Sequence, residues 1–480
     1  MPELSVAAQA AFRSLYGALL LLTLLWALPQ ARRFFVSERW GGYAESSSDI
    51  DRIQHPIVVP LLLATWLACG VLLVGGVWTI AASAVNLLLC HYFFVRMRWR
   101  GVARGLGAPG FMTYWLGAAV FILELTLRMG PDVRSLALLV LQVDFAFIML
   151  SAGVYKLSAG YARDHGMEYG LVNPEWGYWW RRWSSVAPAH PVFRLLNHLA
   201  WTTEIAAALL MLVPATREIG ALLIMASFVF IATQIRLAWL CEMVILAGVL
   251  YFAPGGWGDR VLSSFVAPAT VTAMDGAGAA QIALTAILAG YLVLLPLAHA
   301  GLFMNFYLRR PLPGVLQRAL EAYTNFFGLI IWRVFSVDVV NFLVLVHRQR
   351  RDTGARTLVS RWGEARSFRY CHVAEAIAIT SVFTTLKYHP SNRELFETRL
   401  LRYARTVPTH AEEDLVFEVR SVFKDATRFS LVPVAEWTVD LTARTVREHA
   451  LRDAESVRRP HAVSPIHEGV RPGTYAPRPM

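Results

Sequence analysis

The chain has 480 residues, and its 45 Lys and Arg against 34 Asp and Glu give a net charge of +11. Hydrophobic residues make up 56% of the sequence, which is above the roughly 45–50% of soluble domains. This composition excludes a disordered chain and an ordinary soluble enzyme, and it indicates an integral membrane protein. Because the positive charge is spread over loops that would face anionic lipid, membrane lipids are the expected partners and nucleic acid is not.

Apolar segments of the roughly 20 residues that cross a bilayer core fill the first two thirds of the chain. Since only helices satisfy every backbone amide at that depth, the segments predict an all-α polytopic membrane bundle of about nine transmembrane helices over residues 1–309. The expected spans are residues 12–30, 56–75, 77–95, 110–128, 134–157, 193–213, 217–236, 238–254 and 281–305.

Arginines are concentrated in alternate loops, for example at Arg32, Arg96, Arg181 and Arg309. Basic loops of membrane proteins tend to stay in the cytoplasm. This distribution predicts an N-terminus outside the cytoplasm and a C-terminal region inside it. An error of one in the number of spans would invert part of this topology.

The polar composition after residue 309 predicts three further regions. Residues 310–334 form an amphipathic connecting segment that either lies on the membrane surface or leads to a soluble domain. Residues 335–455 read as a small α+β domain, and residues 456–480 as a disordered tail. The expected elements of the domain are a hairpin of Val337 to Val346 with Arg356 to Trp362, a helix from Cys371 to Lys387, a helix capped by Ser391 and Glu394, strands at Leu415 to Phe423 and Phe429 to Leu441, and a last strand or helix near Leu451.

Ionisable residues inside the expected spans are the most informative positions, because each is costly unless it faces the bundle interior or a cavity. They are His91, Glu124, Asp144, Lys156, His198, Glu204, Arg236, Glu242 and His299. We expect interfacial positions for His91 and His299, an i,i+4 pair of Glu124 with Arg128, and a pair of Arg236 with Glu242. Asp144, Lys156 and Glu204 then require another explanation.

Lys156 follows the small residues Ser151 to Gly153, which would let another helix approach closely. Burial there would disfavour the charged ammonium, and the amine could act as a general base near neutral pH. The alternative is that the long side chain lifts its charge to the membrane interface. The sequence leaves both interpretations open.

The loop after Lys156 is rich in aromatic residues. These are Tyr161, Tyr169, Trp176, Tyr178, Trp179, Trp180 and Trp183, with Arg181 and Arg182 beside them. Such a composition is typical of a helix that lies in the membrane interface. In a second interpretation, the aromatic rings cover a pocket for a flat apolar ligand such as a quinone.

The stretch AGVYKLSA at 152–159, continued by GMEY at 166–169, resembles the signature of the vitamin K-dependent gamma-carboxylase family and of its bacterial relatives, the HTTM (horizontally transferred transmembrane) domain proteins. The resemblance covers about residues 10 to 305 and implies an HTTM-type bundle. It also implies that Lys156 is the base that deprotonates a reduced quinone similar to vitamin K hydroquinone, with Glu204 as an acidic catalytic position. Substrate-binding roles are then expected for Asp144, Tyr155, Glu168, Tyr169 and Trp176.

Two functions are therefore weighed for a multi-pass protein of a bacterial inner membrane. The first is a carboxylase- or oxygenase-like membrane enzyme, a carbon–carbon lyase or quinol epoxidase, that acts on a quinol or lipid-like substrate. The second is a non-catalytic scaffold that binds lipid or quinone and presents its C-terminal domain to a protein partner. A transporter ranks third, since the sequence shows neither paired halves nor matched broken helices.

Overall fold

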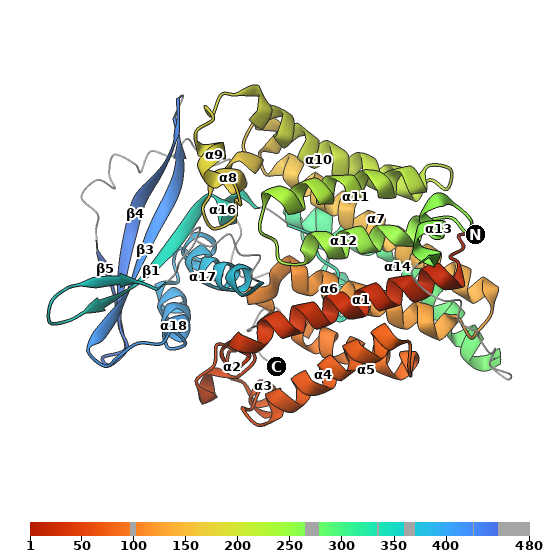
Figure 1. Cartoon of the computed structure of the whole chain (residues 1–480), viewed down its shortest axis with the longest axis horizontal. Coiled ribbons are helices and arrows are strands. Elements are labelled where there is room, and N and C mark those ends of the chain that lie inside the picture. The colour runs from red at the N-terminus through yellow and green to blue at the C-terminus, as the bar shows by residue number, and fades with distance from the viewer. Residues whose placement is uncertain (97–101, 265–277, 334–335, 360–369, 426, 450–480) are drawn as a thin grey trace.

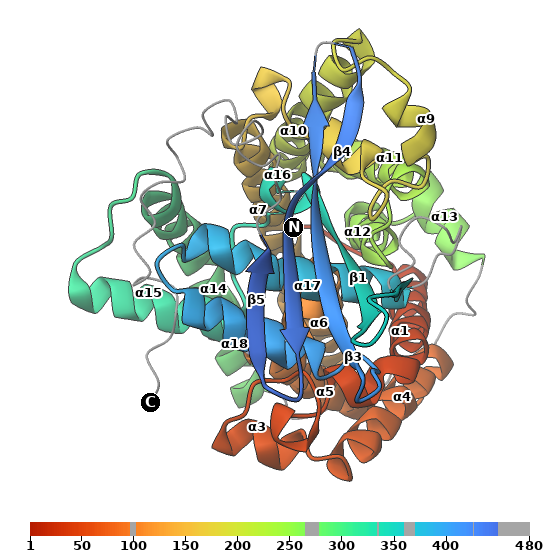
Figure 2. The ribbon, with the colours of Figure 1, turned by 90° about the vertical axis from the view of Figure 1, so that its left-hand side faces the viewer.

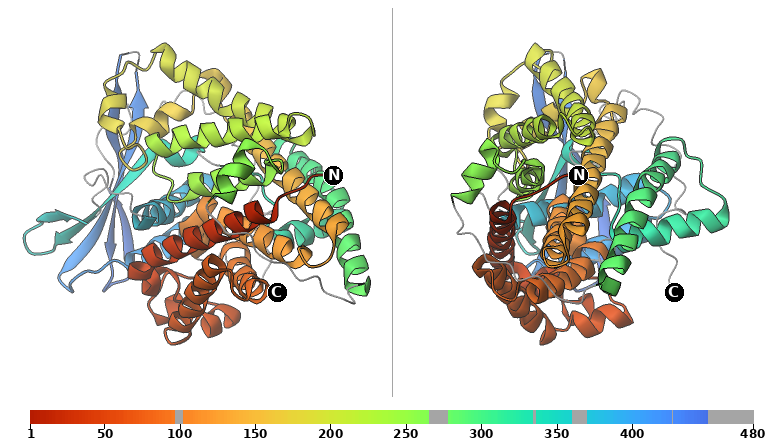
Figure 3. Two further views of the ribbon diagram at one scale, coloured as in Figure 1. Left: turned by 45° about the vertical axis from the view of Figure 1, so that its right-hand side comes forward. Right: turned by 90° about the vertical axis from the view of Figure 1, so that its right-hand side faces the viewer.

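The computed structural model describes residues 1–96, 102–264, 278–333, 336–359, 370–425 and 427–449. A helical bundle is joined at one end to a small antiparallel sheet, and the N-terminus lies at the opposite end of the bundle (Figures 1 and 3). The predicted fold class, a helical bundle followed by a small domain that contains a sheet, is confirmed at this level. The expected disordered tail lies outside the described residues.

Eight helical segments within the described residues are long and apolar enough to cross a membrane. They are built on α1 (Val6–Ala27), α4 (Val58–Gly75), α5 (Thr79–Cys90), α6 (Val102–Thr126), α7 (Pro131–Ser158), α10 (Pro191–Leu212), α11 (Arg217–Gln234) and α14 (Gly278–Tyr307). The segment of α5 reaches spanning length only with the π-helical turn η3 (His91–Arg96).

The predicted span at 238–254 is wrong in length. It forms α12 (Leu240–Gly248) and one 3-10 turn, η5 (Val249–Tyr251), because Ala238 has a positive φ of 53° before it and Pro254 follows it. The short helix nevertheless carries the chain along α11 to the N-terminal end of the bundle (Figure 1). There Asp259 accepts a hydrogen bond from Ser5, so α13 (Trp257–Ser263) lies beside the start of α1.

Several buried polar groups have partners that the sequence did not suggest. Glu124 pairs with Arg13 at 3.5 Å, not with Arg128. Arg236 donates to the carbonyls of Pro174 and Gly177, at 2.8 and 3.2 Å, in place of Glu242. Both pairs were predicted from neighbours in sequence, whereas the actual partners come from distant segments.

The two histidines differ in their surroundings. His91 is bonded through Nε2 to the carbonyl of Phe326 at 2.7 Å, close to the end of the α5 span. His299 is 1% exposed and stacks on Phe147, and neither ring nitrogen has a hydrogen-bond partner among the described residues. The His299 ring is therefore buried without a hydrogen-bond partner among the described residues, and its expected interfacial position stays a prediction.

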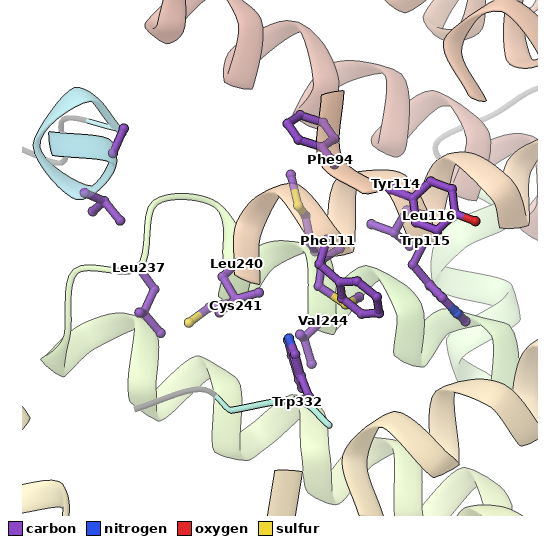
Figure 4. Close-up of a cluster of buried hydrophobic side chains, with 14 of the residues drawn as sticks. Phe94, Phe111, Tyr114, Trp115, Leu116, Leu237, Leu240, Cys241, Val244 and Trp332 are labelled. Carbon is purple, nitrogen blue, oxygen red and sulfur yellow. The ribbon is translucent and has the colours of Figure 1, made fainter. Parts of the chain in front are cut away.

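Shorter helical elements connect the long helices. They are η1 (Leu28–Gln30), α2 (Ala31–Phe34), η2 (Glu38–Trp40), α3 (Ser48–Ile53), η4 (Tyr161–Arg163), α8 (Met167–Val172), α9 (Trp180–Ser184), α13 (Trp257–Ser263) and α15 (Gly314–Phe327). After α15 the chain runs through the bundle interior, where Trp332 lies among Phe111, Val244 and other apolar side chains (Figure 4).

The C-terminal region is a five-stranded antiparallel sheet of order β2-β1-β3-β4-β5 with helices on one face (Figure 2). Its elements are α16 (Val337–Val340), β1 (Phe342–Arg350), β2 (Arg356–Leu358), α17 (Tyr370–Tyr388), α18 (Arg393–Ala404), β3 (Glu413–Lys424), β4 (Phe429–Asp440) and β5 (Thr445–His449). Phe383 of α17 and Phe396 of α18 pack against Phe417 and Trp437 of the sheet. Helix α17 also contacts α6, so it connects the sheet with the bundle.

The predicted hairpin is confirmed for β1 and β2, with His347 opposite Leu358, although its first four residues form α16. Residues 360–362 of the predicted second strand lie outside the described residues. The predicted capping box is wrong. Asn392, not Ser391, caps α18, because its side chain accepts a hydrogen bond from the Leu395 amide at 3.0 Å. The final element is a strand, β5, which resolves the alternative that the sequence left open.

Candidate functional site

Lys156 lies in the last turn of α7, and its amine points into the protein. The residue is 2% exposed, as is Glu204 of α10. The Lys156 Nζ lies 2.5 Å from Oε1 and 2.6 Å from Oε2 of Glu204. The interpretation in which the lysine lifts its charge to the interface therefore does not describe this structure.

A close approach of α7 and α10 makes this contact. A Cβ on Gly153 would lie 2.7 Å from Ile205 Cγ1 and 3.1 Å from the carbonyl oxygen of Trp201. Only glycine leaves room for the α10 backbone at this point, one turn before Lys156. The sequence-based expectation that small residues admit a neighbouring helix agrees with this packing.

The start of α10 fixes which residues face α7. Pro191 occupies the first helical turn, and the His190 ring accepts a hydrogen bond from the Val192 amide at 3.2 Å. Proline fits a first turn because its missing N–H would lack a helical partner there in any case. From this start, Asn197 and Glu204 fall seven residues apart on one face of the helix.

Burial of the Lys156–Glu204 ion pair costs hydration free energy that the pairing must offset. Both ions lose their hydration, and their attraction repays that cost only when geometry is good and the remaining polar atoms are bonded. Here one ammonium meets both oxygens of one carboxylate. Removing either partner alone would leave an unpaired buried charge. The contact also offers a direct path for a proton between nitrogen and oxygen.

A second Lys–Glu pair, with a buried carboxylate and a partly exposed lysine, lies nearer the start of α10 on the same face. Glu168 of α8 is 1% exposed and accepts hydrogen bonds from Asn197 Nδ2 and from Lys424 Nζ, both at 2.8 Å. Asn197 also accepts from the Met167 amide at 2.7 Å. Lys424 is the last residue of β3, so this pair connects the α8 turn with the C-terminal sheet.

Tyr169 borders the second pair. Its ring centroid is 5.4 Å from the Lys424 nitrogen, and its hydroxyl is 3.1 Å from His165 Nε2. Burial raises the pKa of the Tyr169 hydroxyl above its ordinary value, and the negative charge of Glu168 adds to that increase. The hydroxyl is therefore neutral over the physiological range.

The remaining predicted site residues lie elsewhere. Asp144 accepts hydrogen bonds from Trp115 at 2.9 Å and Tyr291 at 3.1 Å. It precedes Lys156 by twelve residues, or about 18 Å along the helix. The Tyr155 hydroxyl donates to Ser336 at 2.8 Å. Trp176 is buried in the loop before α9, where its carbonyl accepts from the Arg236 amide.

The aromatic residues of the loop are engaged at the end of α11. The Trp179 indole donates to the Thr233 carbonyl at 3.0 Å, and the Trp183 indole donates to Gln234 at 3.2 Å. Trp179 is 44% exposed and has the Arg182 guanidinium 4.9 Å from its ring. This arrangement fits the interpretation of the loop as an interfacial element.

The structure thus joins Lys156 with Glu204, and Glu168 with Tyr169, among the predicted residues. It adds Asn197 and Lys424, which the sequence reasoning missed. An amide seven residues before Glu204 could have indicated Asn197, because the two share a helix face. No sequence signal indicated Lys424. Among the described residues, no group of three or more His, Cys, Asp or Glu side chains is arranged to hold a metal ion.

These features define a multi-pass helical membrane protein with a small sheet domain that contacts the bundle through the ion pair of Lys424 with Glu168. Comparison of the chain with models of protein families, with curated proteins and with solved structures found no match.

Proposed function

We propose that this chain is a membrane enzyme in which Lys156 accepts a proton from a quinol or lipid-like substrate. The contact of the buried Lys156 nitrogen with both oxygens of Glu204 is the observation that carries the proposal. The resemblance of residues 152–169 to the vitamin K-dependent carboxylases and HTTM proteins adds support. A carboxylase- or oxygenase-like reaction follows from the same resemblance.

The two side chains would divide the work. Transfer of one proton from Lys156 to Glu204 leaves a neutral amine beside a neutral carboxylic acid, without a net charge in the membrane. The amine then takes a proton from the substrate hydroxyl and becomes an ammonium again. Return of the Glu204 proton to water restores the carboxylate that holds the ammonium.

The test is oxygen-dependent oxidation of vitamin K hydroquinone by the purified full chain in detergent, followed by quinone absorbance. Lys156→Met should lower turnover by about 10²- to 10⁴-fold, the usual contribution of a positioned base. The double variant Lys156→Met/Glu204→Leu removes both charges, so its loss of turnover cannot be attributed to unfolding by an unpaired buried charge. Lys424→Met is the control in the second pair. Unchanged turnover in a folded double variant would refute the proposal.

A second candidate function is a membrane scaffold that displays the sheet domain to a protein partner and binds lipid or quinone in the bundle. The attachment of the domain favours it, because Lys424 binds Glu168 and Arg33 binds Glu375 across the junction. Lys424→Glu should then abolish the cellular phenotype of the protein. Under the enzyme proposal, Lys156→Met abolishes the phenotype instead.

For location, we propose a bacterial inner membrane with the sheet domain in the cytoplasm. Support comes from the arginine-rich loops, since α2 and α9, which contain Arg32 and Arg181, lie with the sheet at the same end of the bundle (Figure 1). Cysteine at the exposed position of Arg182, labelled with a membrane-impermeant reagent, tests this side. Labelling in intact spheroplasts would contradict the proposed orientation, and labelling only after lysis would support it.

A further inference from the structure

Helix α15 packs beside α14 at the side of the bundle. Its Leu320 packs against Gly301, where an added Cβ would lie 2.8 Å from Leu320 Cδ2. Tyr323 and Phe327, further along α15, lie 6.1 and 5.0 Å from the ring of Tyr291. Tyr291 precedes Gly301 by ten residues, or about 15 Å of helix. The C-terminal end of α15 is therefore deeper in the bundle than its middle.

At that depth the chain reverses. Gly328 has a positive φ of 70°, and two side chains bind the last carbonyls of the helix: His91 that of Phe326, and the Tyr114 hydroxyl that of Phe327 at 3.2 Å. These partners satisfy carbonyls that a helix end leaves open. Irregular backbone inside a membrane requires hydrogen-bond partners for its N–H and C=O groups.

The chain then returns toward the sheet along α7. The Trp332 amide donates to Ser151 at 3.2 Å, and four residues later the Tyr155 hydroxyl of α7 donates to Ser336. Trp332 lies between Phe111 and Val244 in the interior (Figure 4). Its ring also stacks on that of Phe228, with 6.4 Å between the ring centroids. Helix α15 and the segment that follows it thus enter and leave the bundle at the same end, as a re-entrant hairpin.

The outer face of α15 has an apolar stripe. Val315, Ala319, Ala322 and Phe326 follow the i, i+4, i+7, i+11 spacing of one helix face. All four are exposed, Val315 at 71% and Phe326 at 64%. The neighbouring face of the helix holds Leu320, Tyr323 and Phe327 against α14. Figure 2 shows α15 standing out from the side of the bundle, and no described element buries the stripe.

The exposed arginines lie toward the start of α15, whereas Glu321 in its second half is half-buried and accepts a hydrogen bond from Gln317. Arg310, just before α15, and Arg318, in its first half, are both exposed. The exposed apolar surface also continues onto α14, where Val293 is 65% and Leu297 is 63% exposed. Guanidinium groups at the shallow end and apolar side chains at the deep end match the order of a phospholipid, from phosphate to acyl chain.

We propose that the outer face of the α15 hairpin is a binding site for an anionic phospholipid. Arg310 and Arg318 bind the headgroup phosphate, and Val315 and Phe326 lie along the acyl chains. A bilayer lipid fits better than a protein partner, because the stripe is continuous with the apolar face of a membrane-spanning helix. The site is separate from the Lys156–Glu204 pair and does not depend on the proposed enzyme activity.

Native mass spectrometry of the full chain, equilibrated with mixed phosphatidylglycerol and phosphatidylcholine micelles, tests the headgroup contacts. The wild type should retain phosphatidylglycerol in preference. The variant Arg310→Gln/Arg318→Gln should lose that preference. The matched control Arg428→Gln/Arg444→Gln, which removes two exposed charges from the sheet loops, should keep it. Absence of a preference in the wild type, or equal loss in both variants, would overturn the proposal.

A second measurement tests the acyl contacts and the alternative occupant. Phe326→Cys, labelled with bimane in phosphatidylglycerol liposomes, should be quenched by lipids brominated in the acyl chain. Quenching by aqueous iodide instead would place the residue in water and overturn the site. Disulfide-linked dimers formed through this cysteine would assign the stripe to a second copy of the chain, and would also overturn it.

Discussion

Asn197 and Glu204 lie two turns apart on one face of α10, and each binds a member of a different Lys–Glu pair. Glu204 holds Lys156 inside the bundle, whereas Asn197 supports Glu168, which holds Lys424 of the sheet. One helix face therefore serves both the proposed reactive pair and the attachment of the C-terminal domain. The two functions can be separated by mutation, because each pair has its own lysine.

Breaking the Lys156–Glu204 pair should destabilise the bundle strongly. Glu204→Gln leaves the ammonium without its counter-ion, and the expected loss in the free energy of unfolding is about 3–5 kcal/mol. Lys156→Met/Glu204→Leu should lose much less, because no buried charge remains. Denaturant unfolding in detergent measures both. A double variant as unstable as the single one would show that the pair contributes more than mutual neutralisation.

Lys424→Met should loosen the sheet domain without changing the bundle. Glu168 would lose its cationic partner while keeping the Asn197 and Gly166 amides, and we expect a cost of about 1–3 kcal/mol. Hydrogen exchange should increase in β3 and α8 but not in α7. The control is Arg393→Gln, whose exposed ion pairs with Glu397 and Glu448 stay within the domain. Equal exchange in both variants would contradict an attachment role for Lys424.

Gly153→Ala should separate α7 from α10. The added methyl would lie 3.0 Å from the Ile205 amide nitrogen, so a backbone shift is needed. Overpacking of this kind costs about 1–3 kcal/mol. Gly290→Ala is the matched control, because nothing lies within 4 Å of its added methyl on α14. A melting temperature that falls for the first variant and holds or rises for the second is the expected outcome.

Glu175 should make stability depend on pH. It is 4% exposed, and neither carboxyl oxygen has a partner among the described residues. Burial raises the pKa of this carboxyl well above its ordinary value of 4.5, and the charge of Glu375 adds to the increase. A raised folded-state pKa means that the folded protein binds the proton more tightly than the unfolded chain does.

The stability from this proton is fully present below pH 4.5 and is lost by about 1.4 kcal/mol per unit as pH rises toward the folded-state pKa. Glu175→Gln stays neutral, so this part of the pH dependence should vanish. Thermal unfolding of both proteins between pH 5 and about pH 8 measures the difference. Parallel curves would show that Glu175 ionises normally in the folded protein.

The long spans and the hairpin could be predicted because local patterns determine them. Hydropathy identified α1 and α7, and the turn at Arg351 to Gly354 indicated β1 and β2. Hydropathy separated the spans at 217–236 and 238–254, but it could not determine the length of α12, because apolar residues continue on both sides of this helix. The left-handed conformation of Ala238, which precedes the start of α12, leaves no trace in an average over residues.

The site could be predicted only in part, for a related reason. The burial cost of Lys156 and Glu204 singled out both residues, but their contact depends on how α7 and α10 pack. Partners that come from remote segments carry no local signal. Arg13 replaces Arg128 as the partner of Glu124, and Lys424 is supplied by a strand of another domain.

The pairing of Arg33 with Glu375 also bears on how the molecule is made. Arg33 follows the first membrane helix, whereas Glu375 lies in α17 near the other end of the chain. Ribosomes deliver the first long before the second. The contact between Arg33 and Glu375 therefore cannot form until α17 has been synthesised. Chains arrested before α17 should remain sensitive to protease near Arg33.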